Sequence, residues 1–191
     1  MNILALPGIH LLAHKFGWPS LRAKAFDAKY NSGHWTNMDE CPEVLRTVER
    51  VNAGGDIAIL GCGTNALGRG LSPHSYATLT GLDMSLEAIR RSKESAPPHQ
   101  YFQLADMEIF NDNRKYDTVI FHESIYYIPS NRVRDALNHW RKQLRPDGKI
   151  IITIAQAERY RDLIATALEG ATVLEDGPAQ SGGQRRLIVL Q

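Results

Sequence analysis

The sequence has little cysteine, little net charge and no long apolar run. Its two cysteines, Cys41 and Cys62, lie far apart and form no CxxC pair or metal-ligand spacing, so no metal site is expected and a reduced compartment fits. A formal net charge of +1 gives no reason to expect nucleic acid or an anionic membrane as a partner. Residues 1–18 are apolar but interrupted by Pro7 and Lys15, which makes them a poor signal peptide and too polar to span a bilayer. We therefore expect a cytoplasmic protein.

Several catalytic motifs are also absent. GxxxxGK[ST] does not occur, which excludes a P-loop nucleoside triphosphatase, and the absence of GxSxG argues against a nucleophile elbow. The letters HESIY at 122–126 resemble HExxH but lack its second histidine, so no zinc protease site is expected. What remains is an ordinary composition, 43% hydrophobic and 23% charged, in 191 residues. This is enough for one domain with a full core and a short appendage.

The stretch over residues 56–85 is the most informative part of the chain. It predicts a strand, a turn at Gly61 and Gly63, a helix over about 65–71 and a second strand ending before Asp83. Two glycines let the chain leave a strand sharply and let a ligand approach bare backbone, and the next helix offers free N–H groups. A carboxylate at the end of the second strand can accept hydrogen bonds from ribose hydroxyls. The stretch therefore predicts a site for an adenosine-like ligand.

Helical and strand patterns alternate along the chain. The expected helices cover residues 20–29, 42–52, 65–71, 85–95, 133–144 and 157–168, and the expected strands cover 57–60, 76–82, 100–104, 116–121, 149–154, 171–175 and 186–190. This alternation indicates an α/β sheet that is mostly parallel. The last two strands have no helix between them, so we expect an antiparallel hairpin at one edge. Residues 1–40 are interpreted as an N-terminal helical lid or appendage and residues 41–191 as the ligand-binding domain.

The segment FDAKYNSGHW, residues 26–35, is dense in aromatic side chains and rich in turn residues. Two interpretations stay open. Its rings could be anchors that pack the appendage on the core, or the segment could be a lid that closes over a bound ligand. The two are compatible, because a lid also needs anchors.

A nicotinamide dinucleotide is one possible ligand. Gly61-x-Gly63-x-x-Ala66 satisfies the loose pattern GxGxxG/A, but that pattern alone is a weak signal. No Tyr-x-x-x-Lys occurs, and no room remains for a separate substrate domain. An NAD(P)-dependent oxidoreductase is therefore the less favoured alternative.

Four segments, in order, resemble the class I S-adenosylmethionine-dependent methyltransferases: LGCGTN, GLDMS, LADMEIF and LRPDGKIII. The segment YDTVIFHESIYYIP is similar to the family's fourth strand. The resemblance implies a Rossmann-like seven-stranded sheet of order 3-2-1-4-5-7-6, mostly parallel with an antiparallel C-terminal edge strand and helices on both faces. It also implies S-adenosyl-L-methionine as cofactor, S-adenosyl-L-homocysteine as product, and residues 41–191 as the methyltransferase domain.

The resemblance also implies roles for individual residues. The glycine turn would border the methionine part of the cofactor, Asp83 would bind the ribose, and Asp106 would accept from the adenine amino group. The cofactor-binding residues implied in this way are Gly61, Cys62, Gly63, Asn65, Asp83, Met84, Asp106, Met107 and His122.

Two positions depart from the family pattern. Ile59 stands where the family usually has an acidic residue, two positions before the first glycine. Asn65 replaces the family's third glycine, which is a milder change because asparagine tolerates a left-handed backbone. The change at Ile59 motivates a rival hypothesis, a catalytically silent subunit that binds the cofactor or a partner.

Methyl transfer from a sulfonium is an in-line displacement in which positioning supplies much of the acceleration. A general base is needed only if the acceptor must lose a proton, and His122 is the candidate, with pocket shaping as its alternative role. Glu123 is a second catalytic candidate, as a group that orients a neighbour or touches the cofactor. The candidate substrate-binding residues are Tyr30, His34, Trp35, Tyr126 and Tyr127.

The acceptor is expected to be small, because the chain has few extra elements and no large substrate domain. The segment at residues 26–35 loosely resembles the lid of small methyltransferases that act on sugars and secondary metabolites. We therefore expect O- or N-methylation of a small molecule by a monomer or homodimer.

Overall fold

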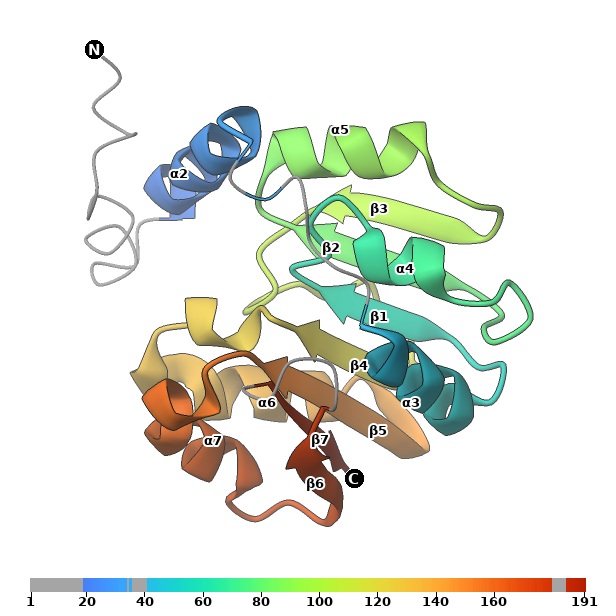
Figure 1. Ribbon diagram of the computed structural model, residues 1–191, viewed down its shortest axis with the longest axis vertical. Helices are drawn as coiled ribbons and strands as arrows, with labels where there is room; N and C mark the ends of the chain where they lie inside the picture. Colours follow the sequence, from blue (N-terminus) through green and yellow to red (C-terminus); the bar gives the residue numbers. More distant parts are fainter. Residues whose placement is uncertain (1–18, 34, 36–40, 180–184) are drawn as a thin grey trace.

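The computed structural model describes residues 19–33, 35, 41–179 and 185–191, which form one central sheet with helices on both faces (Figure 1). The strands are β1 (Ile57–Leu60), β2 (Leu79–Asp83), β3 (Gln100–Leu104), β4 (Tyr116–His122), β5 (Leu144–Ile154), β6 (Val173–Pro178) and β7 (Arg186–Leu190). The α-helices are α2 (Pro19–Asn31), α3 (Pro42–Asn52), α4 (Ala66–Gly70), α5 (Leu86–Glu94), α6 (Val133–Arg141) and α7 (Arg161–Leu168). Three short 3-10 helices are η2 (Ile125–Tyr127), η3 (Ser130–Arg132) and η4 (Ala157–Tyr160).

The strand order is β3-β2-β1-β4-β5-β7-β6. Strands β1 to β5 pair in parallel, whereas β7 runs antiparallel to both of its neighbours, β5 and β6. The predicted sheet order and the antiparallel final hairpin are therefore confirmed. Strand β6 forms the outer edge, and the antiparallel strand β7 lies just inside it.

The central strands contribute side chains to two apolar clusters, because successive strand residues point to opposite faces of the sheet. On one face, Val44 of α3, Leu67 of α4 and Ile89 of α5 pack against the strands. On the other face, Trp140 of α6 and Ile164 of α7 do the same. Both faces of the sheet are covered, which explains why β1 and β2 are buried along their whole length.

Local sequence signals set several helix bounds as expected. Pro42 occupies the first turn of α3, where its missing N–H has no helical partner to lose. The Ser85 hydroxyl accepts a hydrogen bond from Ala88 N at 3.1 Å and caps α5. Asn65 precedes α4 in the left-handed region, with φ 66°, as its identity allows.

Strand β5 begins at Leu144, five residues before the expected start at residue 149. The reason is that Leu144 pairs with Tyr116 of β4, and the register then shifts before the regular pairing of Thr118 with Lys149. Residues 145–148, which precede the expected start, thus form an irregularity within the strand. Asp147, with φ 65°, carries part of the bend.

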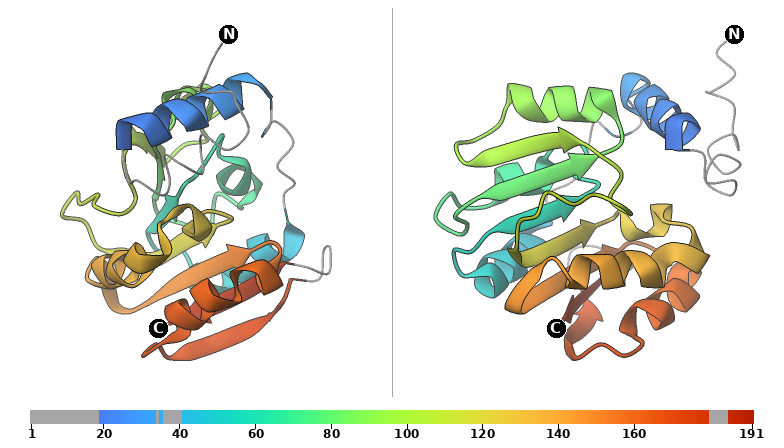
Figure 2. Two further views of the ribbon diagram at one scale, coloured as in Figure 1. Left: turned by 90° about the vertical axis from the view of Figure 1, so that its left-hand side faces the viewer. Right: turned by 180° about the vertical axis from the view of Figure 1, so that it is seen from behind.

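Helix α2 lies beyond the carboxyl ends of the parallel strands, beside α5 (Figures 1 and 2). Its Asp27 Oδ1 accepts hydrogen bonds from Ser85 Oγ at 2.6 Å and from Glu87 N at 3.2 Å, which ties the helix to the start of α5. The rest of the expected appendage, residues 1–18, 34 and 36–40, lies outside the described residues. Among the described helices, none combines the length and apolar character needed to cross a bilayer.

Candidate cofactor and acceptor site

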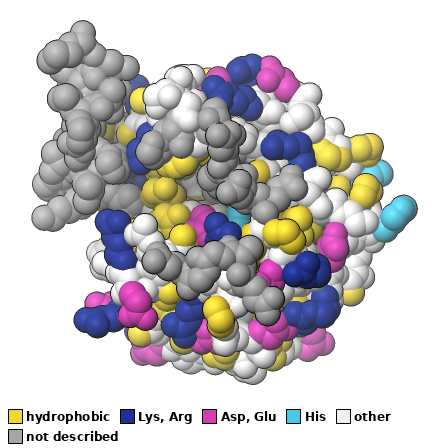
Figure 3. Space-filling view, in the orientation of Figure 1, with side chains coloured by type: hydrophobic (Ala, Val, Ile, Leu, Met, Phe, Trp, Pro, Cys, Tyr) yellow, Lys and Arg dark blue, Asp and Glu magenta, His cyan; other side chains and the backbone are white. Residues whose placement is uncertain are grey.

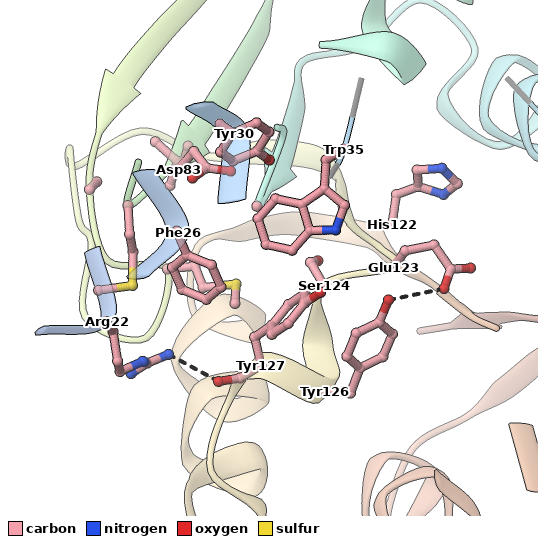
Figure 4. Close-up of a pocket in the computed structure, with 15 residues that line it drawn as sticks. Arg22, Phe26, Tyr30, Trp35, Asp83, His122, Glu123, Ser124, Tyr126 and Tyr127 are labelled. Carbon is pink, nitrogen blue, oxygen red and sulfur yellow. Dashed lines mark hydrogen bonds between the residues drawn. The ribbon is translucent and has the colours of Figure 1, made fainter. Parts of the chain in front are cut away.

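A pocket lies at the edge of the sheet where the parallel strands end, which is where open α/β sheets bind ligands (Figure 4). Its walls come from α2, the turn after β1, the ends of β2 and β4, the segment after β3, and η2. Figure 3 shows the side of the molecule that is seen in Figure 1, where apolar, charged and histidine side chains lie close together near the middle. The lining residues are Arg22, Phe26, Tyr30, Trp35, Gly61, Leu82, Asp83, Met84, Ala105, Met107, His122, Glu123, Ser124, Tyr126 and Tyr127.

The free volume of this pocket is about 80 Å³, below the roughly 300 Å³ at which pockets for drug-sized ligands begin. A smaller cavity adjoins it around the glycine turn and includes Ile59, Cys62, Thr64, Ala66 and Leu67 in its lining. Tyr30, Trp35, Gly61 and His122 border both spaces. Tyr30 and Trp35 therefore line both the pocket and the cavity around the glycine turn.

The turn after β1 needs glycine at two positions. Gly61 and Gly63 have φ of 69° and 56°, in the left-handed region that other residues rarely adopt. A Cβ on Gly61 would lie 2.7 Å from Ser124 Cβ, and one on Gly63 would lie 2.9 Å from the Tyr30 hydroxyl. The turn thus brings bare backbone to the pocket wall, as the sequence predicted.

Asp83, at the end of β2, is held in place by backbone donors. Its Oδ2 accepts from Gly63 N at 3.0 Å and its Oδ1 accepts from Ser85 N at 2.8 Å. Burial raises the pKa of the Asp83 carboxyl to about 6, although these two backbone hydrogen bonds oppose the shift. A carboxylate has about four acceptor positions, so this one keeps capacity to accept from a ligand that enters the pocket.

Only some of the other predicted cofactor-binding residues lie in the pocket wall. Met84 and Met107 line the pocket, whereas Asp106 does not and uses its Oδ1 to accept from Glu108 N at 2.9 Å. Asn65 is buried and donates to Gln100 Oε1 at 2.7 Å. Cofactor contacts by Asp106 and Asn65 stay predictions.

His122 ends β4 and faces both cavities. Its Nδ1 lies 2.8 Å from Thr153 Oγ1 on the adjacent strand β5. Burial lowers the pKa of the His122 imidazole to about 4; the Glu123 carboxylate works against this shift and the Arg185 guanidinium adds to it. The ring is therefore neutral at ordinary pH.

Glu123 follows His122 in a left-handed conformation, φ 52°, which turns its carboxylate away from the strand direction. Its Oε1 accepts from Arg185 Nε at 2.8 Å, and its Oε2 accepts from Ala155 N at 2.7 Å and from the Tyr126 hydroxyl at 3.3 Å. Both carboxylate oxygens are thus engaged within the protein. Sequence reasoning missed Arg185, which precedes β7 and has no local signal that points to Glu123.

An aromatic cluster forms another part of the pocket wall. The ring centroids of Tyr30 and Trp35 lie 4.8 Å apart, those of Tyr126 and Tyr127 4.8 Å, and those of Trp35 and Tyr127 6.1 Å. Four candidate substrate-binding residues are therefore brought together. The fifth, His34, lies outside the described residues.

A buried ion pair attaches α2 to the pocket. Arg22 Nη1 lies 2.6 Å from Glu108 Oε1, with both side chains 2% exposed, and Arg22 Nη2 donates to Tyr127 O at 3.0 Å (Figure 4). Arg132 Nε lies 2.9 Å from the second Glu108 oxygen. No sequence motif marked this pair, because its members lie 86 residues apart.

The residues that line the pocket fit a sulfonium nucleoside cofactor. The glycine cradle would be filled by any Cβ, a buried carboxylate stands at the end of β2, and Met84 and Met107 offer an apolar surface for a base. These features match the chemistry of a ribose and an adenine side by side. Within the described part of the chain, no cluster of histidine, cysteine and acidic residues could hold a metal ion.

A family model described as Nodulation protein S (NodS) matches residues 32–175. Nodulation protein S of Azorhizobium caulinodans is 35% identical over 99 residues, which are 51% of this chain and 47% of that protein. The chain therefore matches about half the length of this curated relative.

Solved structures of similar fold include N-methyltransferase NodS from Bradyrhizobium japonicum WM9, with TM-score 0.68 and 22% identity, covering 78% of this chain and 92% of that one. The same enzyme in complex with S-adenosyl-L-homocysteine gives TM-score 0.67 at 22% identity, covering 82% and 90%. A DhpI complex with the same ligand, abbreviated SAH, gives TM-score 0.66 at 18% identity and covers 98% of both chains. At these identities, the likeness establishes the fold.

Proposed function

The chain belongs to the Nodulation protein S family, and from this premise we propose that it is an S-adenosylmethionine-dependent methyltransferase that N-methylates a small-molecule acceptor. The observation that carries the proposal is the Asp83 carboxylate, fixed by Gly63 N and Ser85 N beside the glycine turn. Family membership also disfavours the alternative of a nicotinamide-dependent oxidoreductase.

In this proposal, Asp83 accepts hydrogen bonds from the ribose hydroxyls, while Met84 and Met107 flank the adenine. The turn at Gly61 and Gly63 borders the methionine part. Bound S-adenosylmethionine supplies an activated methyl group, and S-adenosylhomocysteine is the product. The chain's own residues bind, orient and exclude water, which is how positioning accelerates such a displacement.

The proposed acceptor is a neutral amine. Support comes from the similar solved structure of the Bradyrhizobium protein, which is an N-methyltransferase, and from the wall made by Trp35, Tyr126 and Tyr127. Aromatic faces attract a nitrogen that gains positive charge as it is methylated. The nitrogen lone pair forms the new N–C bond, the S–C electron pair returns to sulfur, and the product ammonium afterwards loses a proton to water.

Residues 1–40 are proposed to be a lid and residues 41–191 the catalytic domain. Support comes from α2, which contacts the pocket through Arg22, Phe26 and Tyr30 and lies outside the sheet. The narrow space between Trp35 and the glycine turn implies that this lid shifts to admit the cofactor. A role for His34, a monomeric or homodimeric state and a cytoplasmic location stay predictions.

Ile59 supports a second candidate, a catalytically silent subunit. Its side chain is 2% exposed and borders the glycine-turn cavity, where it offers no carboxylate. The two candidates differ in turnover: we expect transfer of a labelled methyl group to amines from a panel that also contains alcohols and carboxylic acids. Calorimetric binding of S-adenosylmethionine without transfer to any member would favour the silent subunit, and binding of NAD instead would contradict both.

A further inference from the structure

His122 and Thr153 are register partners on the parallel strands β4 and β5. In-register residues on neighbouring strands point to the same face of a sheet, which brings His122 Nδ1 to 2.8 Å from Thr153 Oγ1. Glu123 N lies 3.2 Å from the same hydroxyl oxygen. Thr153 is fully buried, so solvent cannot satisfy its hydroxyl group.

The hydroxyl proton of Thr153 decides which ring nitrogen of His122 carries hydrogen. A threonine hydroxyl donates once and accepts through its lone pairs. The backbone N–H of Glu123 can only donate; it is shared between the Thr153 carbonyl oxygen at 3.1 Å and Thr153 Oγ1 at 3.2 Å, so it uses one of those lone pairs. In the described part of the chain, His122 Nδ1 is then the acceptor within hydrogen-bonding distance of the Thr153 proton. The opposite arrangement, with Nδ1–H donating, would leave a buried hydroxyl proton unpaired, which is unfavourable.

We propose that Thr153 is a positioning residue that holds His122 as its Nε2–H tautomer, so that the ring presents a hydrogen-bond donor to the cavity. A general base needs a lone pair directed at the proton it removes. In this tautomer His122 has no lone pair directed into the cavity, which favours the pocket-shaping role over that of a general base. The nearby charged groups do not change this assignment, because the Glu123 carboxylate is already engaged by Arg185, Ala155 N and Tyr126.

The donor at Nε2 recognises an oxygen atom of a bound ligand. The attacking nitrogen cannot be its partner, because that lone pair must face the methyl group. An oxygen of the cofactor's methionine part and an oxygen of the acceptor are the two possible sources. This ligand assignment rests on the proposed function, whereas the tautomer does not.

The test is nitrogen NMR of the full chain with ring-¹⁵N histidine. His122→Gln identifies the His122 resonances among those of the seven histidines. We expect the pattern of a neutral ring with Nε2 protonated and Nδ1 unprotonated. Thr153→Val should leave only the weaker preference for Nε2–H that a free neutral imidazole has, so the share of the Nδ1–H form should rise, while Thr153→Ser, which keeps the hydroxyl, should keep the wild-type pattern. A wild-type ring with Nδ1 protonated would overturn the proposal, as would an unchanged ratio of the two tautomers in Thr153→Val.

Thermal unfolding of the variants guards against misfolding, and the tautomer of the wild-type ring keeps the proposal falsifiable if Thr153→Val does not fold. Addition of S-adenosylhomocysteine and then of a methylatable amine distinguishes the two ligand sources by which step moves the Nε2 resonance. If both bind and neither moves it, the donor role is wrong. If neither ligand binds at all, the proposed function fails while the tautomer result stands on its own.

Discussion

The two walls of the pocket are built in different ways. The cofactor wall is mostly backbone: the turn at Gly61 and Gly63 donates to Asp83 only 20 residues further on, and strand register fixes both. The wall beside the proposed lid, here called the lid wall, is made of side chains: Arg22 of α2 contacts Tyr127 across 105 residues, and Arg185 of the domain itself contacts Glu123 across 62 residues. The comparison predicts that changes in the cofactor wall alter cofactor affinity, while changes in the lid wall leave the sheet intact.

The largest expected effect comes from a substitution that weakens the lid wall alone. Arg22→Met leaves the buried Glu108 carboxylate with Arg132 as its remaining charged partner. Removing one member of a buried pair typically costs about 3–5 kcal/mol. Because α2 lies at the margin of the fold, we expect this cost to appear as undocking of α2. Hydrogen exchange should show fast amides in α2 and protected amides in the strands.

The matched control is Arg50→Met, which breaks the exposed pair between Arg50 and Glu175. Exposed pairs contribute only about 0–1 kcal/mol, so exchange in α2 should not change. Global unfolding of Arg22→Met, with the strands losing protection together with α2, would show that lid and sheet are one unit. The proposed boundary between residues 1–40 and 41–191 would then be wrong.

The next effect concerns the cofactor wall. Asp83→Ala should weaken S-adenosylmethionine binding by about 1.5–3 kcal/mol, or roughly 10- to 150-fold, the range for hydrogen bonds to a charged group. Calorimetry measures the change, and Asp162→Ala on the exposed start of α7 is the control of equal chemistry. Unchanged affinity in a folded Asp83→Ala variant would show that the ribose site is misassigned.

The same contrast explains what the sequence could predict. The glycine turn, Asp83 and the final antiparallel hairpin follow from local patterns, since strand periodicity and turn residues act over short distances. The sheet order came from the family resemblance and not from any local pattern. Thr153 and His122 could have been paired only with the register of β4 against β5, which the sequence does not state. Arg22 and Arg185 were missed because their partners are set by packing of distant elements. Glu123 was identified as a site residue, but two of its three hydrogen bonds, from Ala155 N and Arg185, come from residues far away in the sequence.

A smaller effect concerns the contact between the two walls, where Tyr30 meets the glycine turn. Gly63→Ala places a methyl group 2.9 Å from the Tyr30 hydroxyl at φ 56°, and the left-handed backbone alone costs about 1–2 kcal/mol. Tyr30→Phe removes the hydroxyl and should relieve the steric part of the penalty in the double variant. Denaturant unfolding of the four proteins in this cycle gives the coupling energy. Strict additivity would show that Tyr30 does not press on the glycine turn.

The smallest expected effect is a pH dependence that separates Asp83 from His122. Protonation removes acceptor capacity from Asp83, whose pKa burial raises to about 6. S-adenosylmethionine affinity should therefore fall as the pH drops below about 6, by at most about tenfold per pH unit for one proton. His122, with its pKa lowered to about 4, should add nothing between pH 5 and 8.

Stability of the protein without cofactor should change with pH in the opposite direction. The folded state holds the Asp83 proton more tightly than the unfolded chain, where the carboxyl has its ordinary pKa of 3.8, so this group makes stability fall as pH rises from about 4 to about 6. His122 opposes that trend, because its lowered folded pKa makes stability fall as pH drops from 6.5 towards 4. Asp83→Asn should therefore remove the pH dependence of binding and leave stability that only decreases with acid. Binding by Asp83→Asn that still weakens below pH 6 would assign the proton to another group in the pocket.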